Sequence, residues 1–119
     1  MNIYISHSSG YDYENELYKP IKESELSNTH RFFLPHESDN VGVDAKDELK
    51  RTDILVAEAS HPSTGQGIEL GQASAAGVPI VCFYRTGAKF SSSLRFVTGE
   101  IIEYSDAQDF LAKLSARLA

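Results

Sequence analysis

One stretch, residues 53–77, constrains the fold of this chain more than any other. It reads DILVAEASHPSTGQGIELGQASAAG. Its residues 54–57 are a short apolar run with β-branched side chains and no turn former, which is typical of a strand buried on both faces of a parallel sheet. The following SHPSTGQG is rich in Gly, Ser and Pro, so the chain turns there. IELGQASAA, followed by Gly77 and Pro79, then predicts a helix with a defined end.

Glu69 is expected in the first turn of that helix, next to the carboxyl end of the strand. In open α/β sheets ligands bind outside the carboxyl ends of the strands, and Gly65 and Gly67 would let the backbone approach a ligand closely. The unpaired N–H groups and the helix dipole favour an ionised carboxylate, which makes Glu69 a candidate base or nucleophile. The alternative is ordinary helix capping by an acidic residue.

Length and charge limit the classes of function. With 119 residues, 41% of them hydrophobic, the chain is expected to form one domain over residues 1–119. Eleven basic and 17 acidic residues give a net charge of −6, which argues against nucleic acid or an anionic membrane as a partner. The start, MNIYISHSS, has no basic region, and no apolar run is long enough to span a bilayer. We therefore expect a cytoplasmic protein with a small-molecule ligand.

Strands and helices are expected to alternate along the chain. The predicted strands are residues 2–6, 29–34, 54–57, 79–84 and 100–104. The predicted helices are residues 11–26, which Pro20 should bend or interrupt, 43–51, 68–76, and a last helix capped by Ser105. Right-handed crossovers then predict an α/β fold, a flavodoxin-like or Rossmann-like three-layer sandwich with a five-stranded, mostly parallel sheet of order 2-1-3-4-5.

Two polar connections are candidates for ligand contacts. The first strand is followed by Ser8, Ser9 and Gly10, whose N–H groups and hydroxyls suit an anion, although an N-cap and turn would use the same residues. The connection of residues 85–99 contains three consecutive serines at positions 91–93. Loops of that length inside a compact domain are usually functional or mobile.

Three sequence blocks together point to a known family. They are D-x-x-V-A-E at residues 53–58, P-S-x-G-x-G-x-E-L-G at residues 62–71, and A-x-G-x-P-I at residues 75–80. In these blocks the chain resembles the nucleoside 2-deoxyribosyltransferase-like proteins, and most closely their 2′-deoxynucleoside 5′-monophosphate N-glycosidase branch. The middle block is the specific one. The resemblance implies a nucleotide N-glycosidase in which Glu69 attacks the anomeric carbon, the base departs, and water hydrolyses the resulting ester.

The resemblance also implies roles for other residues. Tyr4 matches the family's catalytic set, and His36 is expected near the sugar and base, where the alternative is a solvated loop histidine. The phosphate is expected on a set of serines, with a serine contributed by the neighbouring subunit of a homodimer. The substrate-binding residues expected in this way are Ser8, Ser9, Gly10, Ser63, Gly65, Gly67 and either Ser92 or Ser93.

The sequence departs from the family pattern at the proton donor. The family uses an aspartate from the helix before the third strand to protonate the leaving base. In ungapped register that position is Ala45, with Asp44 beside it and Asp47 two residues on. Because one residue turns a helical side chain by about 100°, Asp44 can act as the donor only if the shorter loop shifts the register. His7 and Gly10 also differ from the glycine and the arginine expected at their positions.

Nothing in the sequence predicts a metal or a cofactor. The four histidines lack ligand spacing, Cys82 is the single cysteine, and neither a P-loop nor a dinucleotide fingerprint occurs. Two other functions remain open: a deoxyribosyltransferase acting on unphosphorylated nucleosides, which the serine set disfavours, and a non-catalytic nucleotide-binding or interaction module. The opening IYISHSS also resembles Toll/interleukin-receptor-like domains, but no second block matches them.

Overall fold

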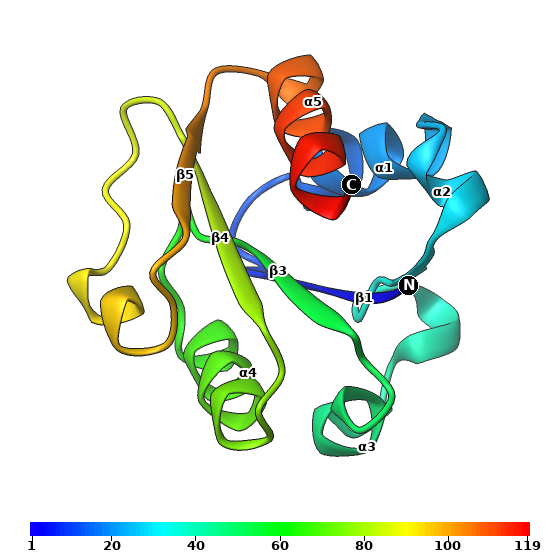
Figure 1. Cartoon of the computed structure of the whole chain (residues 1–119), viewed down its shortest axis with the longest axis vertical. Coiled ribbons are helices and arrows are strands. Elements are labelled where there is room, and N and C mark those ends of the chain that lie inside the picture. Colours follow the sequence, from blue (N-terminus) through cyan, green and yellow to red (C-terminus); the bar gives the residue numbers. More distant parts are fainter.

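Five parallel strands form a single sheet at the centre of the computed structural model, which describes residues 1–119 (Figure 1). All neighbouring pairs are parallel, in the order β2-β1-β3-β4-β5. The strands are β1 (Asn2–His7), β2 (Arg31–Phe33), β3 (Ile54–Glu58), β4 (Ile80–Arg85) and β5 (Ile101–Tyr104). The predicted fold class and strand order are confirmed, and the sheet is parallel throughout.

Helices cover both faces of the sheet and complete the three layers (Figure 1). One face carries the π-helical turn η1 (Glu14–Tyr18), α1 (Lys19–Glu23), α2 (Leu26–Thr29) and α5 (Ala107–Leu118). The other face carries α3 (Ala45–Leu49), α4 (Thr64–Ala75) and the 3₁₀ turn η3 (Ser92–Phe96); a second 3₁₀ turn, η2 (Ser38–Asn40), precedes α3. None of these helices has the length and hydrophobicity that crossing a membrane requires.

The alternation of side chains along the strands explains the two cores. Ile54 and Val56 of β3 pack with Leu114 and other residues under α1 and α5, whereas Leu55 and Ala57 pack on the α4 side. Successive strand residues point to opposite faces, and a parallel sheet covered on both faces needs apolar residues at both sets of positions. The short apolar run recognised in the sequence is therefore a strand with no solvent-facing side.

The predicted first helix is broken into three pieces. Its π-helical turn changes to α-helix at Lys19, and Pro20 lies in the first turn of α1. Because Pro20 has no N–H to donate, a regular series of hydrogen bonds cannot run through it, and the wider π turn precedes it. Extended backbone at Ser24 (ψ 158°) then ends α1 before the short α2.

Helix starts differ from the predicted ones, and the clearest differences are in the last helix and in α4. The last helix is capped by Asp106 rather than Ser105, because the Asp106 carboxylate accepts the N–H of Asp109 at 2.8 Å. Helix α4 starts at Thr64, with the Ser63 side chain accepting the N–H of Gln66. The glycine-rich segment is therefore helical, and Glu69 lies in the second turn of α4 and not in the first. The predicted end of α4 is confirmed, with Gly77 at a positive φ of 75°.

Candidate active site

Glu69 meets β1 at the carboxyl end of the sheet. The Tyr4 hydroxyl donates a hydrogen bond to Oε2 of Glu69, and the Ser6 hydroxyl donates to Oε1 at 2.8 Å. Tyr4 and Ser6 lie two residues apart on β1, so both side chains point to the α4 face of the sheet. The structure thus brings together two of the three side chains predicted as catalytic, Tyr4 and Glu69, and adds Ser6, which the sequence analysis did not single out.

The environment of Glu69 shifts its acidity in the opposite direction to the one expected. Burial raises the pKa of Glu69 above its ordinary value, and the hydrogen bonds from Tyr4 and Ser6 and the attraction of His36 offset only part of this rise. The expectation that the helix dipole stabilises ionised Glu69 is wrong. The dipole effect falls off within the first turn of a helix, and Glu69 lies in the second turn of α4. Ionised Glu69 is instead stabilised by two hydroxyl donors.

Gln66 holds the start of α4 against the sheet. Its side chain is 4% exposed, and its amide donates to the backbone oxygens of Ser6 at 3.2 Å and Glu58 at 2.8 Å. These oxygens belong to the carboxyl ends of β1 and β3, so one side chain fixes two strand ends relative to the helix that carries Glu69. Gln66 lies between Gly65 and Gly67 of the middle sequence block, and its position there was the only sequence signal for this role.

His36 belongs to an aromatic cluster, together with His7, Tyr13 and Tyr18. Its ring centroid lies 4.8 Å from that of His7 and 5.3 Å from that of Tyr13. Its backbone N–H donates to the Tyr18 hydroxyl at 3.0 Å, and the same oxygen lies 2.6 Å from Nε2 of His7. His7, where the family pattern has glycine, therefore helps to fix the loop that carries His36.

The cluster keeps His7 neutral. Burial lowers the pKa of His7 to about 4, so at neutral pH its imidazole carries no charge. Its two ring nitrogens face the Tyr18 hydroxyl and the backbone oxygen of Ser8, which is 2.8 Å from Nδ1. The sequence analysis placed Tyr13 on the apolar face of a helix and missed the cluster, because its members come from three separated segments.

The serines predicted to bind phosphate fall into two groups. Ser63 and Ser93 line one cavity of about 520 Å³ between α4 and η3, together with Gly67 and the other lining residues Pro62, Thr64, Gln66, Leu70, Gly71, Ser91, Leu94 and Val97. Ser92, in the first position of η3, and Gly65, in the first turn of α4, do not line it. Ser93 and Ser63 are thus neighbours within one chain.

Glu69 points away from this cavity. Gly67 and Gly71 line the cavity, and Glu69 is two positions from each of them along α4. Because each residue turns the helix by about 100°, the Glu69 side chain points about 160° away from both glycines. Helix α4 lies between η3 on one flank and α3 on the other (Figure 1). The Ser63–Ser93 cavity and the carboxylate of Glu69 therefore occupy opposite flanks of α4.

The segment after β1 forms a local turn. Ser8 is 6% exposed, and its hydroxyl accepts the N–H of Gly10 at 3.0 Å. A Cβ added to Gly10 would lie 3.3 Å from that hydroxyl oxygen, which makes the turn tight. Ser9 is exposed. Anion binding by these three residues stays a prediction.

Asp44 lies outside the site. Its carboxylate is exposed and accepts the N–H of Lys46 at 2.9 Å as the N-cap of α3. Ala45, half-buried, packs instead against the cluster that contains Tyr4. The shift of register that would turn Asp44 toward Tyr4 and Glu69 is not seen, because capping fixes Asp44 just before the first helical residue. A methyl group occupies the position where an acid was expected.

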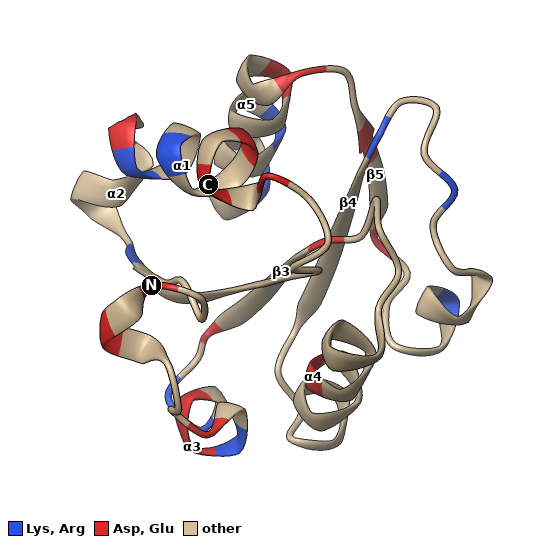
Figure 2. Ribbon diagram, turned by 180° about the vertical axis from the view of Figure 1, so that it is seen from behind, with Lys and Arg blue, Asp and Glu red and all other residues tan.

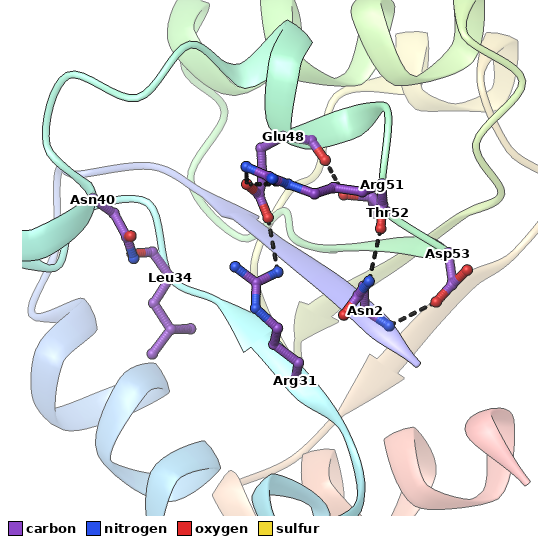
Figure 3. A network of polar contacts seen from close by, with 8 residues as sticks. All are labelled: Asn2, Arg31, Leu34, Asn40, Glu48, Arg51, Thr52 and Asp53. Atoms are coloured by element: carbon purple, nitrogen blue, oxygen red, sulfur yellow. Dashed lines mark hydrogen bonds and ion pairs between the residues drawn. The ribbon is translucent and has the colours of Figure 1, made fainter.

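Two buried carboxylates stabilise the scaffold. Glu58 is 3% exposed at the end of β3 and accepts hydrogen bonds from the N–H and hydroxyl of Ser60 and from the Tyr104 hydroxyl. Glu48 of α3 accepts from Arg31 at 2.9 Å and from Arg51 at 2.9 Å (Figure 3). Burial acts to raise the pKa of Glu48, but the two guanidinium groups outweigh it and lower that pKa.

Metal ligation is not evident in the arrangement of side chains. No three His, Cys, Asp or Glu side chains lie close enough together to hold a metal ion. The site is thus a half-buried carboxylate with two hydroxyl donors.

Curated relatives match part of this chain. The 5-hydroxymethyl-dUMP N-hydrolase of Mus musculus is 45% identical over 49 residues, 40% of this chain and 28% of that protein. The putative 2′-deoxynucleoside 5′-phosphate N-hydrolase 1 of Thermofilum pendens is 32% identical over 75 residues, 59% of this chain and 52% of that protein. The resemblance predicted from the sequence is confirmed. The chain spans about half or less of the length of these relatives, and no protein-family model matches it.

Solved structures match the whole fold. The CMP N-glycosidase BcmB of Clostridium botulinum superposes with a TM-score of 0.71 at 21% identity and covers 98% of this chain and 99% of that one. The 2-desoxiribosyltransferase of Leishmania mexicana superposes with a TM-score of 0.64 at 18% identity, covering 93% and 95%. The chain thus has the fold of nucleoside deoxyribosyltransferase-like proteins.

Proposed function

We propose that this protein hydrolyses the base–sugar bond of (2′-deoxy)nucleoside 5′-monophosphates, with Glu69 as the nucleophile. The observation that carries the proposal is the half-buried carboxylate of Glu69 at the carboxyl end of the sheet, held by Tyr4 and Ser6 and forming no ion pair with a cationic side chain. An ion-paired carboxylate would be a weaker nucleophile. The names of the curated relatives, N-hydrolases of nucleoside monophosphates, support the same reaction.

The reaction has two steps. One oxygen of Glu69 forms a bond to the anomeric carbon while the bond from that carbon to the base breaks, and its electron pair leaves with the base. Water then hydrolyses the glycosyl ester and restores the carboxylate. The hydrogen bonds from Tyr4 and Ser6 orient the two oxygens so that one lone pair faces the sugar.

A homodimer would complete the phosphate site. Ser93 lies on the flank of α4 opposite to Glu69. A substrate bound at Glu69 is therefore poorly placed to contact Ser93 of the same chain, and Ser93 is better placed to contact the substrate of a neighbouring subunit. Ile68 and Phe96, 56% and 75% exposed, offer apolar surface on α4 and η3 for such a contact. Residues 86–99 carry Lys89 and Arg95 and no acidic residue (Figure 2). Although the chain as a whole is acidic, this segment is positively charged and suits the binding of a phosphate. A nucleotide substrate also fits the expected cytoplasmic location.

The catalytic test uses a panel of nucleotides. The wild-type protein should release free base from at least one of CMP, 5-hydroxymethyl-dUMP and the four common 2′-deoxynucleoside 5′-monophosphates, as followed by chromatography. Glu69→Gln should reduce turnover by several orders of magnitude and leave affinity little changed, because charge and nucleophilicity are lost but shape is kept. Glu25→Gln, the same change at an exposed position on the other face, is the control. Full turnover in Glu69→Gln would refute the mechanism.

The transferase is the second candidate, supported by the fold shared with the Leishmania mexicana protein. A ligand that binds only the folded state raises the melting temperature. If serines hold the phosphate, a monophosphate should raise it clearly more than the matching nucleoside. Equal shifts, together with exchange of bases between nucleosides, would favour the transferase. No shift and no turnover with any compound would favour the non-catalytic module.

The dimer has its own test. Light scattering at micromolar concentration should give twice 13.1 kDa, and Phe96→Asp should shift the protein toward monomer, because a charge would then lie in the apolar contact. A wild-type protein that is only monomeric would contradict the shared site.

A further inference from the structure

The two hydroxyl groups that contact Glu69 have no proton to spare for a leaving base. Tyr4 and Ser6 each carry one hydroxyl proton, and each donates it to an oxygen of Glu69. Burial and the hydrogen bond to Glu69 also raise the pKa of Tyr4 well above its ordinary value, so this hydroxyl is a poor acid near neutral pH. Both side chains therefore hold the nucleophile and do not protonate the base.

Helix α3 forms the flank that Glu69 faces. Glu69 points away from η3, and α3 lies on the other flank of α4 (Figure 1). Because α3 leads into β3 at the amino edge of the sheet, its first residues are directed to the carboxyl edge, where Glu69 also lies. Ala45 is the first residue of α3 and is half-buried against the core cluster that contains Tyr4. The inner side chain of α3 at this edge is therefore a methyl group.

The carboxylates of α3 and its cap are engaged elsewhere. Asp44 is exposed and accepts a backbone N–H of α3 at 2.9 Å. Asp47 is exposed and lies 3.6 Å from the ammonium group of Lys50. Burial acts to raise the pKa of Glu48, but two arginines outweigh it and lower that pKa, so Glu48 is ionised near neutral pH. None of these three groups is an acid that faces Glu69.

A base can leave without an acid from the protein when its anion is stable. As the bond to the anomeric carbon breaks, the electron pair goes to the base nitrogen, and in uracil the charge spreads over two carbonyl oxygens. Cytosine has one carbonyl group and an amino group, so its anion is less stable. For such a base a positioned acid contributes about 10²- to 10⁴-fold. An electron-withdrawing group at C5 of uracil stabilises the anion further.

We propose that Ala45 restricts this protein to nucleotides whose base leaves as a stable anion, with uracil and its C5-substituted derivatives as the substrate class. This inference rests on the proposed function. Glu69 takes the sugar as an ester while the base departs as an anion and takes a proton from water. The water that hydrolyses the ester releases one proton, which balances the proton that the base takes up. The products are free base and sugar phosphate, and the Glu69 carboxylate is restored.

The first experiment measures base release from four nucleotides by the full-length protein. Single-turnover conditions are used, so that slow product release does not mask the chemical step. The substrates are dCMP, dTMP, dUMP and 5-fluoro-dUMP, and the last two differ by one atom of similar size. The rate should rise in this order. Cleavage of dCMP should be at least about 10²-fold slower than that of 5-fluoro-dUMP, because the protein supplies no acid.

The second experiment supplies the acid. Ala45→Asp places a carboxyl group at the start of α3, where the charge of Glu69 favours its protonated form. The ratio of the rates for 5-fluoro-dUMP and dCMP should narrow by at least about tenfold in this variant. Ala45→Asn is the matched control, because it has the same shape and no acidic proton, and it should keep the wild-type ratio. The melting temperature of each variant shows whether it is folded, and the wild-type series tests the inference in either case.

The remaining outcomes separate this inference from the proposed function. Equal wild-type rates for all four nucleotides, or cleavage of purine nucleotides alone, would overturn the inference. An unchanged ratio in folded Ala45→Asp would overturn the role of Ala45. If Glu69→Gln abolishes the cleavage seen in the wild type, the proposed function stands even where the inference fails. If the wild-type protein cleaves no nucleotide of either panel, the proposed function fails and the inference fails with it.

Discussion

Replacing Tyr4 by Phe tests the electrostatics of the site without knowledge of the substrate. The substitution removes only the hydroxyl that donates to Oε2 of Glu69 and leaves the buried ring, 1% exposed, in place. Because that bond lowers the pKa of Glu69, its loss should raise the pKa further. The protonated form of Glu69 should therefore persist to higher pH in the variant.

The size of the effect follows from the bond. A hydrogen bond to an ionised group contributes about 1.5–3 kcal/mol, and each 1.4 kcal/mol is a factor of ten in an equilibrium. Ser6 still donates to the other oxygen at 2.8 Å, and Glu69 is partly exposed, so water replaces part of the lost bond. We expect the low end, an ionisation equilibrium about tenfold less favourable. Activity on the acid side of the pH profile should fall by the same factor.

Carboxyl NMR of protein labelled with ¹³C-glutamate measures this directly. The missing resonance in Glu69→Gln assigns the signal, and its titration is then compared between wild type and Tyr4→Phe. Tyr104→Phe is a matched control, because it removes a tyrosine hydroxyl from another buried carboxylate, that of Glu58. An unchanged Glu69 titration in Tyr4→Phe, or the same change in Tyr104→Phe, would refute the reasoning.

Three further predictions concern stability. Glu48→Gln should lower the free energy of unfolding by about 1–2 kcal/mol near pH 7. This value is reduced for solvent screening, because both arginines are more than half exposed. The folded-state pKa of Glu48 is lowered, so this contribution exists above the unfolded value of about 4.3 and should vanish in acid denaturant titrations at lower pH. Leu114→Ala, at 0% exposure, should cost about 2–5 kcal/mol by urea unfolding. Gly77→Ala should destabilise by about 1 kcal/mol because of its positive φ, whereas Gly71→Ala should stabilise α4 by a similar amount; equal signs would contradict this.

The sequence by itself determined the strands, their order and the family resemblance. Strands buried on both faces need continuous apolar runs, and residues 54–57 and 80–83 are such runs. Gly77 marked the end of α4, because glycine adopts a backbone conformation with φ of 75° at little energetic cost. The strands and this helix end depend on neighbours within a few positions, and the local pattern is therefore enough to predict them. The strand order followed from the right-handed crossovers that alternating strands and helices make.

Helix starts depended on contacts that periodicity does not report. Ser63 begins α4 four residues earlier than the apolar pattern predicted, and with it the dipole argument for Glu69 failed. Asp106 caps the last helix in place of Ser105. A short polar side chain beside a helix can cap it or form a turn, and only the backbone conformation decides which.

The tertiary structure alone decided what surrounds Glu69. Its hydroxyl donors Tyr4 and Ser6 lie 65 and 63 positions away in the sequence, and His36 comes from a third segment. Ala45 and Asp44 are adjacent in the sequence, but Ala45 packs toward the sheet whereas Asp44 caps α3 at the surface. The packing of α3 against the sheet decided this difference. Such contacts follow from how sheet and helices pack together, because packing sets the direction of each side chain, and no local pattern contains that information.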